Sequence, residues 1–275
     1  VMMRTFDAKE FLALAAAEKV TALIMVPAMY NLCLLRADFA NYDLSAWRIG
    51  GFGGAPMPED TIHRLAEAVP GLVLTNTYGA TETTSPTALM PPGHGPEHPD
   101  SVGQVVPCGY VLVMDDNGVP VAPGKPGEIW IGGPMVVPGY WQNEEATARE
   151  FSGGYWKSGD IGSLDTRGYL RIFDRKKDMI NRGGYNIYSA EIENALSLHE
   201  GVVESAVIGV ADPVLGEKTH VHVCVRDDAL REEDVKAWCG ERLADYKIPD
   251  FVTLSGEPLP RNANGKIVKR ALRES

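Results

Sequence analysis

A strand, a turn, a helix and a second strand follow one another between Trp47 and Gly79, and this succession constrains the fold most. The first strand reads WRIGGF, the turn GGAP, the helix PEDTIHRLAEAV and the second strand LVLTNTYG, with Pro58 in the first turn of the helix. Because a helical crossover joins parallel strands, this βαβ unit predicts a parallel sheet. We therefore expect residues 1–100 to belong to an α/β subdomain.

Two further patterns precede this unit. Asp7 and Glu10 have the spacing of a capping box, and the apolar residues after them predict a helix over FLALAAAEKV. The apolar run TALIMV then suits a buried strand that ends at Pro27. The α/β subdomain is thus expected to begin before the βαβ unit.

The two strands of the βαβ unit end in loops with unusual chemistry. The small residues of the Gly53–Pro56 turn allow a flat ligand to approach the backbone, whereas Tyr78–Glu82 offers an aromatic ring, a hydroxyl and a carboxylate. Open α/β sheets bind ligands at the carboxyl ends of their strands, where both loops are expected. An aromatic base would stack on Tyr78 for about 1 kcal/mol, Thr81 would hydrogen-bond a phosphate, and Glu82 would hold Mg²⁺. A polar connection with a packed tyrosine is the alternative.

Short strands and turns replace this pattern between residues 101 and 173. Runs such as YVLVMD, EIWIGG and YLRIF predict a small, mostly antiparallel, barrel-like β subdomain. Asp160, in WKSGDIG, is a carboxylate between glycine and apolar residues, and it can accept the two hydroxyls of a ribose or be an ordinary turn residue. His94 and His98 lie among prolines and glycines, which favours loop residues over a metal-binding pair.

The segment Phe173–Glu193 joins two regions of different pattern. It contains a run of charges, paired glycines and the start of a helix that Ser189 can cap. Such a polar joint predicts a domain boundary with a hinge at residues 174–178, or only an exposed linker. The strands and helix that follow predict a C-terminal α+β domain over residues 179–275.

Lys266 lies close to the C-terminal end of the sequence. Asn264 and Gly265 favour a turn that presents this lysine from a loop tip. A bare lysine on a turn is usually only solvated, so the turn alone assigns it no function.

Composition argues against several classes of protein. The 275 residues carry a net charge of −11, which argues against non-specific nucleic-acid binding. No apolar run approaches about 18 residues, and the first residues lack the layout of a signal peptide, so we expect neither a transmembrane segment nor export. The cysteine spacing favours neither zinc nor disulfides and indicates the reducing cytoplasm. The cysteines are Cys33, Cys108, Cys224 and Cys239.

Six segments in this order resemble the adenylate-forming superfamily, which includes acyl-CoA synthetases, luciferases and the adenylation domains of peptide synthetases. They are GGAP, YGATE, GEIWIGG with GYW, WKSGDIG, FDRKKDMINRGGYNIYSAEIE and PRNANGKI, and they extend from about residue 50 to the end. The resemblance is to the C-terminal half of an AMP-dependent acyl-CoA ligase. It implies that a carboxylate and ATP give acyl-AMP and pyrophosphate, after which the thiol of coenzyme A gives a thioester and AMP.

The resemblance also implies roles for single residues. Thr81 would contact the α-phosphate, and Glu82 would bind the magnesium ion. Asp160 and Arg175 would bind the ribose hydroxyls. The residues that it places at the adenine are Gly53, Gly54, Ala55, Pro56, Asn76, Tyr78, Gly79 and Ala80.

Further positions match segments that act in one step of the family's reaction. Lys266 would bridge the substrate carboxylate and the ribose-linked oxygen during adenylation, where a fixed ammonium stabilises developing charge. Lys177 matches the hinge position. Gly183 and Gly184 match the loop along which the pantetheine arm of coenzyme A enters.

Two departures from the family pattern are visible. The Gly-, Ser- and Thr-rich phosphate loop is not found, nor is the first half of the large domain. We therefore expect a fragment, the C-terminal half of a longer synthetase, which forms no acyl-CoA alone. Asp174 stands where the family usually has glycine, and this replacement leaves Arg175 in place.

Other functions compete with the ligase. An adenylation module would load a carrier protein, but lysine rather than aspartate at position 177 and the end of the sequence soon after Lys266 favour the ligase. A non-catalytic nucleotide-binding fragment is the third alternative. The sequence does not identify the acyl group of the substrate. It could be that of a medium- or long-chain acid, as in fatty acid metabolism, or that of an aromatic acid. Formation of a homodimer is also open.

Overall fold

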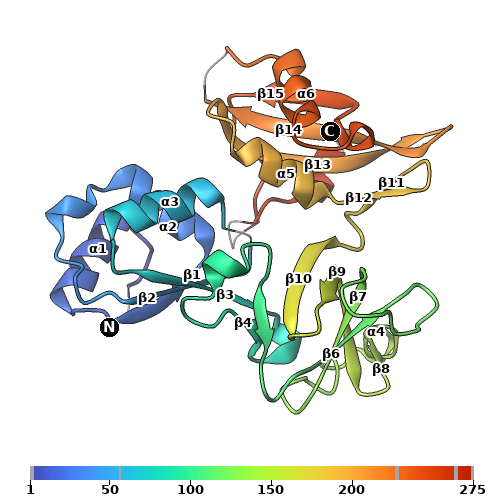
Figure 1. The fold of residues 1–275 in the computed structure, drawn as a ribbon, viewed down its shortest axis with the longest axis horizontal. Helices are drawn as coiled ribbons and strands as arrows, with labels where there is room; N and C mark the ends of the chain where they lie inside the picture. Colours follow the sequence, from blue (N-terminus) through green and yellow to red (C-terminus); the bar gives the residue numbers. More distant parts are fainter. Residues whose placement is uncertain (1–2, 56, 227–228, 263–265, 274–275) are drawn as a thin grey trace. The chain divides into compact units, whose positions relative to one another are not determined.

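The computed structural model describes residues 3–55, 57–226, 229–262 and 266–273. The chain forms two compact units, Val1–Ile172 and Phe173–Ser275, and Figure 1 traces the chain through both. Strand β10 (Tyr169–Arg175) runs across the division between them. Each unit has its own hydrophobic core.

The first unit begins with a parallel α/β arrangement. Its first elements are α1 (Ala8–Ala17), β1 (Ala22–Met25), α2 (Pro27–Arg36), η1 (Phe39–Asn41), β2 (Ile49–Gly53), α3 (Glu59–Ala68) and β3 (Val73–Gly79). Strands β1, β2 and β3 pair in parallel, and α3 joins β2 to β3, which confirms the predicted βαβ unit. The carboxylate of Asp7 accepts hydrogen bonds from the amides of Lys9 and Glu10 and caps α1, as its spacing predicts.

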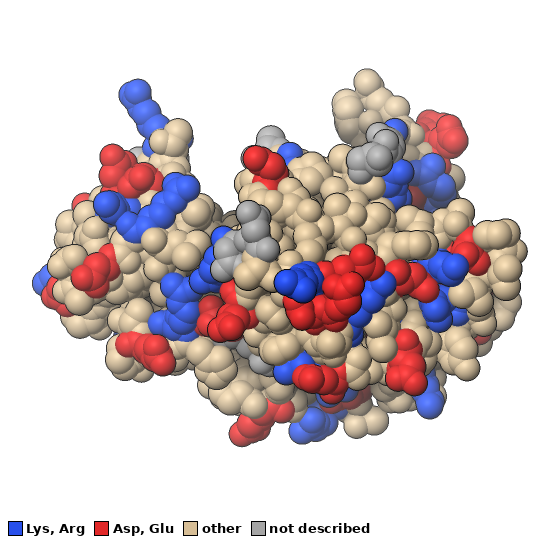
Figure 2. Space-filling model, turned by 90° about the horizontal axis from the view of Figure 1, so that it is seen from above, with Lys and Arg blue, Asp and Glu red and all other residues tan. Residues whose placement is uncertain are grey.

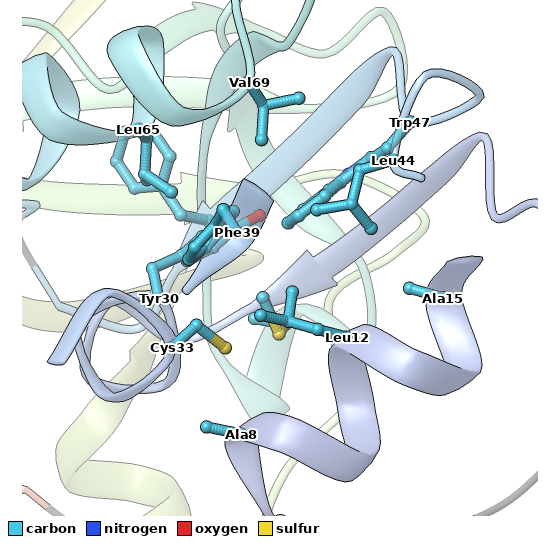
Figure 3. Packing of buried hydrophobic residues seen from close by; sticks show 12 residues of the cluster. Ala8, Leu12, Ala15, Tyr30, Cys33, Phe39, Leu44, Trp47, Leu65 and Val69 are labelled. Carbon is cyan, nitrogen blue, oxygen red and sulfur yellow. The ribbon is translucent and has the colours of Figure 1, made fainter. Parts of the chain in front are cut away.

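A core of aromatic and aliphatic side chains lies between these helices and the parallel strands. Figure 3 shows its members, among which the rings of Tyr30 and Trp47 are stacked with centroids 6.0 Å apart. The hydroxyl of Tyr30 donates to the carbonyl oxygen of Gly51 at 2.9 Å, so α2 is hydrogen-bonded to β2. The core therefore fixes the strands whose ends carry the candidate ligands.

The β-rich segment continues the parallel sheet. Its elements are η2 (Thr81–Thr83), β4 (Pro86–Leu89), η3 (Gly95–Glu97), β5 (Gly103–Val105), β6 (Tyr110–Met114), β7 (Gly127–Gly132), α4 (Glu144–Glu150), β8 (Phe151–Ser152), β9 (Tyr155–Leu164) and β10. Strand β4 pairs antiparallel with β3, and the strand order in the described residues is β1-β2-β3-β4-β5-β10-β9-β7-β6, with β8 beside β9. The predicted α/β and antiparallel β regions are confirmed. The part expected to be barrel-like is an open sheet, and the described residues contain no closed barrel.

The second unit is an α+β domain, as predicted. Its elements after β10 are β11 (Ile180–Arg182), β12 (Tyr185–Ile187), α5 (Ser189–Ser197), β13 (Val202–Asp212), β14 (Gly216–Val225), α6 (Glu232–Gly240), η4 (Asp245–Lys247), β15 (Phe251–Ser255) and α7 (Lys269–Arg273). The strand order is β12-β11-β14-β13, with β15 parallel to β14. Ile192 and Leu196 of α5 and Val235 of α6 share one core with Val221 and Val223 of β14.

Charged side chains of both signs are interspersed over the face shown in Figure 2. Within the described residues, no helix combines the length and the apolar composition needed to cross a membrane. The described part of the chain also contains no group of three or more His, Cys, Asp and Glu residues arranged for a metal ion. All four cysteines are free thiols.

Candidate functional site

The side chains of Tyr78 and Asp160 meet although 82 residues separate them in the chain. The hydroxyl of Tyr78, near the end of β3, donates to Oδ2 of Asp160 at 2.5 Å. Asp160 lies on β9, is only 6% exposed, and its amide donates to the hydroxyl of Ser158 at 3.0 Å. Gly159, directly before it, has φ +69°, a conformation that favours glycine. The sheet thus brings together two residues that the sequence proposes as nucleotide ligands.

The end of β2 lies directly beside the end of β3. Gly53 pairs with Thr77, and a Cβ on Gly53 would lie 2.3 Å from the carbonyl oxygen of Thr77, so only glycine fits. Gly54 follows with φ +79°, and Ala55 is exposed. Pro56, the last residue of the GGAP turn, lies outside the described residues.

The last residues of β3 and the tight connection after it contain the other expected adenine ligands and Thr81. Asn76 and Ala80 are half-buried, whereas Gly79 and Thr81 are exposed. A Cβ on Gly79 would lie 2.8 Å from the carbonyl oxygen of Ser85, so the connection turns closely past the backbone of the next segment. These candidate residues therefore lie together at the carboxyl end of one central strand.

Glu82 lies on η2 and is held from two sides. Its carbonyl oxygen accepts a hydrogen bond from the amide of Val137 at 2.8 Å, and its Oε1 accepts one from the hydroxyl of Tyr140 at 2.9 Å. Burial first, and then the hydrogen bond to Glu82, raise the pKa of Tyr140, so the phenol stays protonated as a donor. From the sequence, Glu82 is expected to bind magnesium, whereas no role is expected for Tyr140. The only signal for it is the GYW segment among those that carry the resemblance.

The groups around Glu82 fit a magnesium ion. A half-buried carboxylate and the exposed Thr81 hydroxyl are hard oxygen ligands, which Mg²⁺ prefers in combination with phosphates and water. Bound there with a nucleotide, the ion would neutralise charge on the phosphate oxygens.

Lys266, Gly183 and Gly184, candidate residues of the second unit, are all exposed. Lys266 is exposed, and its amide donates to Oδ1 of Asn262 at 3.0 Å. Residues 263–265, which include the predicted Asn-Gly turn, lie outside the described residues. Gly183 and Gly184 connect β11 to β12 with φ of +60° and +89°. Their left-handed conformation accounts for the paired glycines.

Arg175 and Lys177 lie where β10 ends, and both are exposed. The amides of Asp178 and Met179 donate to the carbonyl oxygen of Arg175 at 2.9 and 3.0 Å and close a turn around Lys177. The segment predicted as a hinge, residues 174–178, therefore contains a hydrogen-bonded turn. Rotation at this turn stays a prediction.

A buried polar network in the second unit escapes prediction from sequence. Asp174 is 8% exposed, and its Oδ2 accepts hydrogen bonds from the amide and the hydroxyl of Ser189, at 2.5 and 2.7 Å. Nζ of Lys269 donates to the Ser189 hydroxyl at 2.6 Å and pairs with Oε1 of Glu193 at 2.7 Å. That glutamate oxygen also accepts from the amide of Val207 at 2.8 Å. The network ties the end of β10 to α5, β13 and α7.

The start of α5 differs from the expectation that Ser189 caps it. Ser189 is the first residue of the helix, and Tyr188 occupies the capping position without a side-chain hydrogen bond. The carboxylate of Asp174 accepts the amide at the start of the helix instead. Burial raises the pKa of Glu193, although the charge of Lys269 acts in the opposite direction.

Known protein families match both units. The family described as AMP-binding enzyme matches residues 1–141, and the AMP-binding enzyme C-terminal domain matches residues 191–266. The chain is 40% identical over 254 residues to a long-chain-fatty-acid–CoA ligase of Yersinia pestis, covering 92% of the chain and 45% of the relative. It is 38% identical over 276 residues to a feruloyl-CoA synthase of an Amycolatopsis species, covering 99% of the chain and 55% of the relative. The chain thus spans about half the length of the curated relatives it matches.

Two solved structures share the fold. An o-succinylbenzoate CoA synthetase from Bacillus subtilis, in complex with its acyl-adenylate intermediate, superposes with a TM-score of 0.88 at 31% identity, covering 98% of this chain and 54% of that one. An amide bond synthetase from Marinactinospora thermotolerans gives a TM-score of 0.90 at 30% identity, covering 99% and 55%. The predicted combination of α/β and α+β regions is confirmed by these matches.

Proposed function

Because the chain belongs to the AMP-binding enzyme family, we propose that it forms part of an AMP-dependent acyl-CoA synthetase, an acid–thiol ligase. In this reaction a carboxylate attacks the α-phosphorus of ATP to give acyl-AMP and pyrophosphate, and the thiol of coenzyme A then displaces AMP to give a thioester. The observation that carries the proposal is the hydrogen bond between Tyr78 and Asp160. It joins two distant segments at the carboxyl end of β3, where open α/β sheets bind ligands.

The ends of β2 and β3, together with Asp160, are suited to a nucleoside. A flat base can approach the glycine backbone at Gly53 and stack on the ring of Tyr78. A carboxylate has about four acceptor positions, so Asp160 can accept the ribose hydroxyls while it accepts the Tyr78 hydroxyl. Its burial strengthens such hydrogen bonds, because they form away from water. Arg175 would bind the same hydroxyls.

The exposed turns of the second unit would serve separate steps. A lysine ammonium held at the reacting carboxylate stabilises charge that develops during adenylation, and this role falls to Lys266. The Gly183–Gly184 turn presents no side chains and would let the extended pantetheine arm of coenzyme A pass during thioester formation. Lys177 would be the hinge for this change. Rotation about it would bring Lys266 to the nucleotide for adenylation and the Gly183–Gly184 turn for thioester formation.

The proposed substrate is a carboxylic acid with a medium-chain, long-chain or aromatic acyl group, converted in the cytoplasm. Relatives named for long-chain fatty acids and for feruloyl-CoA both support this class. The small side chains of Thr77 and Ala80, at the end of β3, would permit a medium-sized or aromatic acyl group. The proposed cofactors are ATP, Mg²⁺ and coenzyme A.

Titration of the 275-residue chain with AMP tests the nucleotide site. Asp160→Asn should lower AMP affinity about 10-fold or more, because a hydrogen bond to a charged group contributes about 1.5–3 kcal/mol. Asp115→Asn, in the turn between β6 and β7 of the same unit, is the matched control and should leave the affinity unchanged. Absence of AMP binding, or equal binding by Asp160→Asn, would contradict the proposal.

Pyrophosphate release tests the acyl specificity. A ligase that contains this sequence should release pyrophosphate from ATP with long-chain or aromatic carboxylates, and a panel of acids ranks them. AMP binding without pyrophosphate release from any acid would favour the non-catalytic nucleotide-binding alternative.

A further inference from the structure

Glu82, the proposed magnesium ligand, belongs to a single helical turn. Helix η2 spans only Thr81–Thr83, and Thr84 after it has φ +52°, in the left-handed region. A glutamate on so short a turn loses side-chain entropy when it is restricted to one rotamer. Contacts from another part of the chain are therefore needed if its oxygen is to meet a metal ion in one geometry.

A segment 51–58 residues further along the chain supplies these contacts. The hydroxyl of Thr84 donates to the carbonyl oxygen of Met135 at 2.8 Å, and the amide of Val137 donates to the carbonyl oxygen of Glu82 at 2.8 Å. These two hydrogen bonds fix the backbone of the turn. The hydroxyl of Tyr140 instead donates to the carboxylate itself, at 2.9 Å from Oε1.

Tyr140 is itself held in place. Its amide donates to Oγ1 of Thr147 at 2.9 Å, and its ring packs edge-on against Phe151 with centroids 5.5 Å apart. A Cβ on Gly139 would lie 2.5 Å from Cγ2 of Thr147, so a glycine is needed before the tyrosine. Contacts with Thr147 of α4 and Phe151 of β8 therefore hold Tyr140 where its hydroxyl reaches Glu82.

We propose that Tyr140 is a positioning residue that orients the Glu82 carboxylate for the magnesium ion of a bound nucleotide. The inference rests on the proposed function, because it takes Glu82 as a metal ligand. A phenol that donates to Oε1 selects one carboxylate rotamer and leaves the other oxygen for the cation. Loss of a donor that holds a metal-binding carboxylate typically lowers metal affinity about 10- to 100-fold.

Binding of Mn²⁺ to a ligase that contains this sequence, in the presence of ATP and followed by electron paramagnetic resonance, tests this role. Tyr140→Phe keeps the ring and its packing, and it should lower Mn²⁺ affinity about 10-fold. Its affinity for ATP without metal, measured by calorimetry in EDTA, should equal that of the wild type. Tyr169→Phe removes a phenol hydrogen bond of 2.7 Å to Nδ1 of His94 in the same unit, and as the matched control it should change neither affinity.

A double-mutant cycle shows whether Tyr140 acts through Glu82. In Glu82→Asp the shorter carboxylate no longer reaches the phenol, so the addition of Tyr140→Phe should lower Mn²⁺ affinity no further. The amide of Val137 donates to the carbonyl oxygen of Glu82, so its hydrogen exchange with solvent reports on the turn. Slow exchange in Tyr140→Phe should show that this turn is intact.

The outcomes separate the two proposals. Unchanged Mn²⁺ affinity in Tyr140→Phe overturns the positioning role alone. So do equal losses of Mn²⁺ and metal-free ATP affinity, or fast exchange at Val137, because each makes Tyr140 a structural residue. A wild-type ligase that binds no Mn²⁺ with ATP, or binds it no better than its Glu82→Gln variant, overturns both the positioning role and the proposed metal site.

Discussion

The two units hold their candidate residues in opposite ways. In the first unit, the polar candidates Tyr78, Glu82 and Asp160 are buried or half-buried, and each is hydrogen-bonded to a side chain from a distant segment. In the second unit, Lys266 and the Gly183–Gly184 turn are exposed, and the buried polar contacts lie in the frame that carries them.

This difference fits the two kinds of task in the proposed reaction. A nucleotide that stays bound through both steps is served best by ligands fixed in advance. Groups that act in only one step must approach the nucleotide for that step and move away for the other. Exposed groups carried on a folded domain can do this when the domain moves. Changes to Lys266, to the frame at Lys269, to Lys177 and to Asp212 should therefore have effects that decrease in this order.

The largest effect is expected at Lys266. In a ligase that contains this sequence, Lys266→Ala should slow acyl-adenylate formation about 10²- to 10³-fold, since one preorganised charge donor contributes about 3–4 kcal/mol to the transition state. Thioester formation from supplied acyl-AMP should be largely spared, and both half-reactions can be followed separately. Lys236→Ala, on the exposed face of α6, is the control. Equal damage to both half-reactions would mean that Lys266 is structural.

The frame of the second unit should depend on Lys269. Lys269→Met leaves the Glu193 carboxylate, only 23% exposed, without its cation, and should lower the free energy of unfolding of this unit by about 3 kcal/mol. Amide exchange over residues 189–225 in increasing urea measures this unit separately from the first. The double variant Lys269→Met, Glu193→Gln should recover part of the loss, because no charge is then left buried.

The control for this prediction is an exposed pair. Lys236→Met removes the ion pair with Glu232, 2.6 Å long on the surface of α6, and should cost less than about 1 kcal/mol. If Lys269→Met costs no more than Lys236→Met, the network does not anchor the frame.

A smaller, selective effect is expected at Lys177. Proline holds φ near −65° and removes an amide donor, so Lys177→Pro should restrict rotation at the turn that the Arg175 carbonyl closes. In an active ligase we expect thioester formation to slow at least about 10-fold more than adenylation, because the hinge must move between the steps. Lys177→Ala keeps the backbone free and should leave the ratio of the two rates unchanged. Wild-type rates of both steps in Lys177→Pro would place the hinge elsewhere.

The smallest effect is a pH dependence of the hairpin between β13 and β14. A hydrogen bond from Lys218, followed by those from the amides of Leu215 and Val214, lowers the pKa of Asp212 to about 2. A carboxyl group whose pKa is lowered by folding stabilises the folded state above its unfolded pKa of about 3.9. This stabilisation is lost as the pH falls through the folded value, so the window is about pH 4 to 2.

Amide protection checks this prediction. Because the Leu215 carbonyl oxygen accepts a hydrogen bond from the amide of Gly183 at 2.7 Å, this hairpin also supports the glycine turn. The protection factors of Val214 and Leu215 should fall between pH 5 and pH 2, whereas Asp212→Asn should show no such change. Constant protection in the wild type would show that the carboxylate does not hold the hairpin.

Several features could be predicted from sequence because they depend on near neighbours. The cap of α1 depends on Asp7 and on amides two and three residues later. The βαβ unit follows from apolar runs separated by a turn and a helix, and the family follows from short segments whose order is visible in the chain. In each case the information lies within a few residues or in a linear pattern.

Hydrogen bonds between residues far apart in the sequence could not be predicted in this way. No local pattern indicates that Tyr140 reaches Glu82 across 58 residues, or that Tyr78 reaches Asp160 across 82. Ser189 has the residue type of a helix cap, yet the buried carboxylate of Asp174 accepts the hydrogen bonds at the start of α5.

The sequence by itself determined the strands, the helices, the glycine turns and the residue types of the candidate site. Only the tertiary structure decided that the β-rich segment is an open continuation of the parallel sheet and which side chains meet at its strand ends. The physical reason is that alternating apolar residues specify a strand and its buried face but not its neighbour. Strand order is set by the burial of the whole core, to which every segment contributes at once.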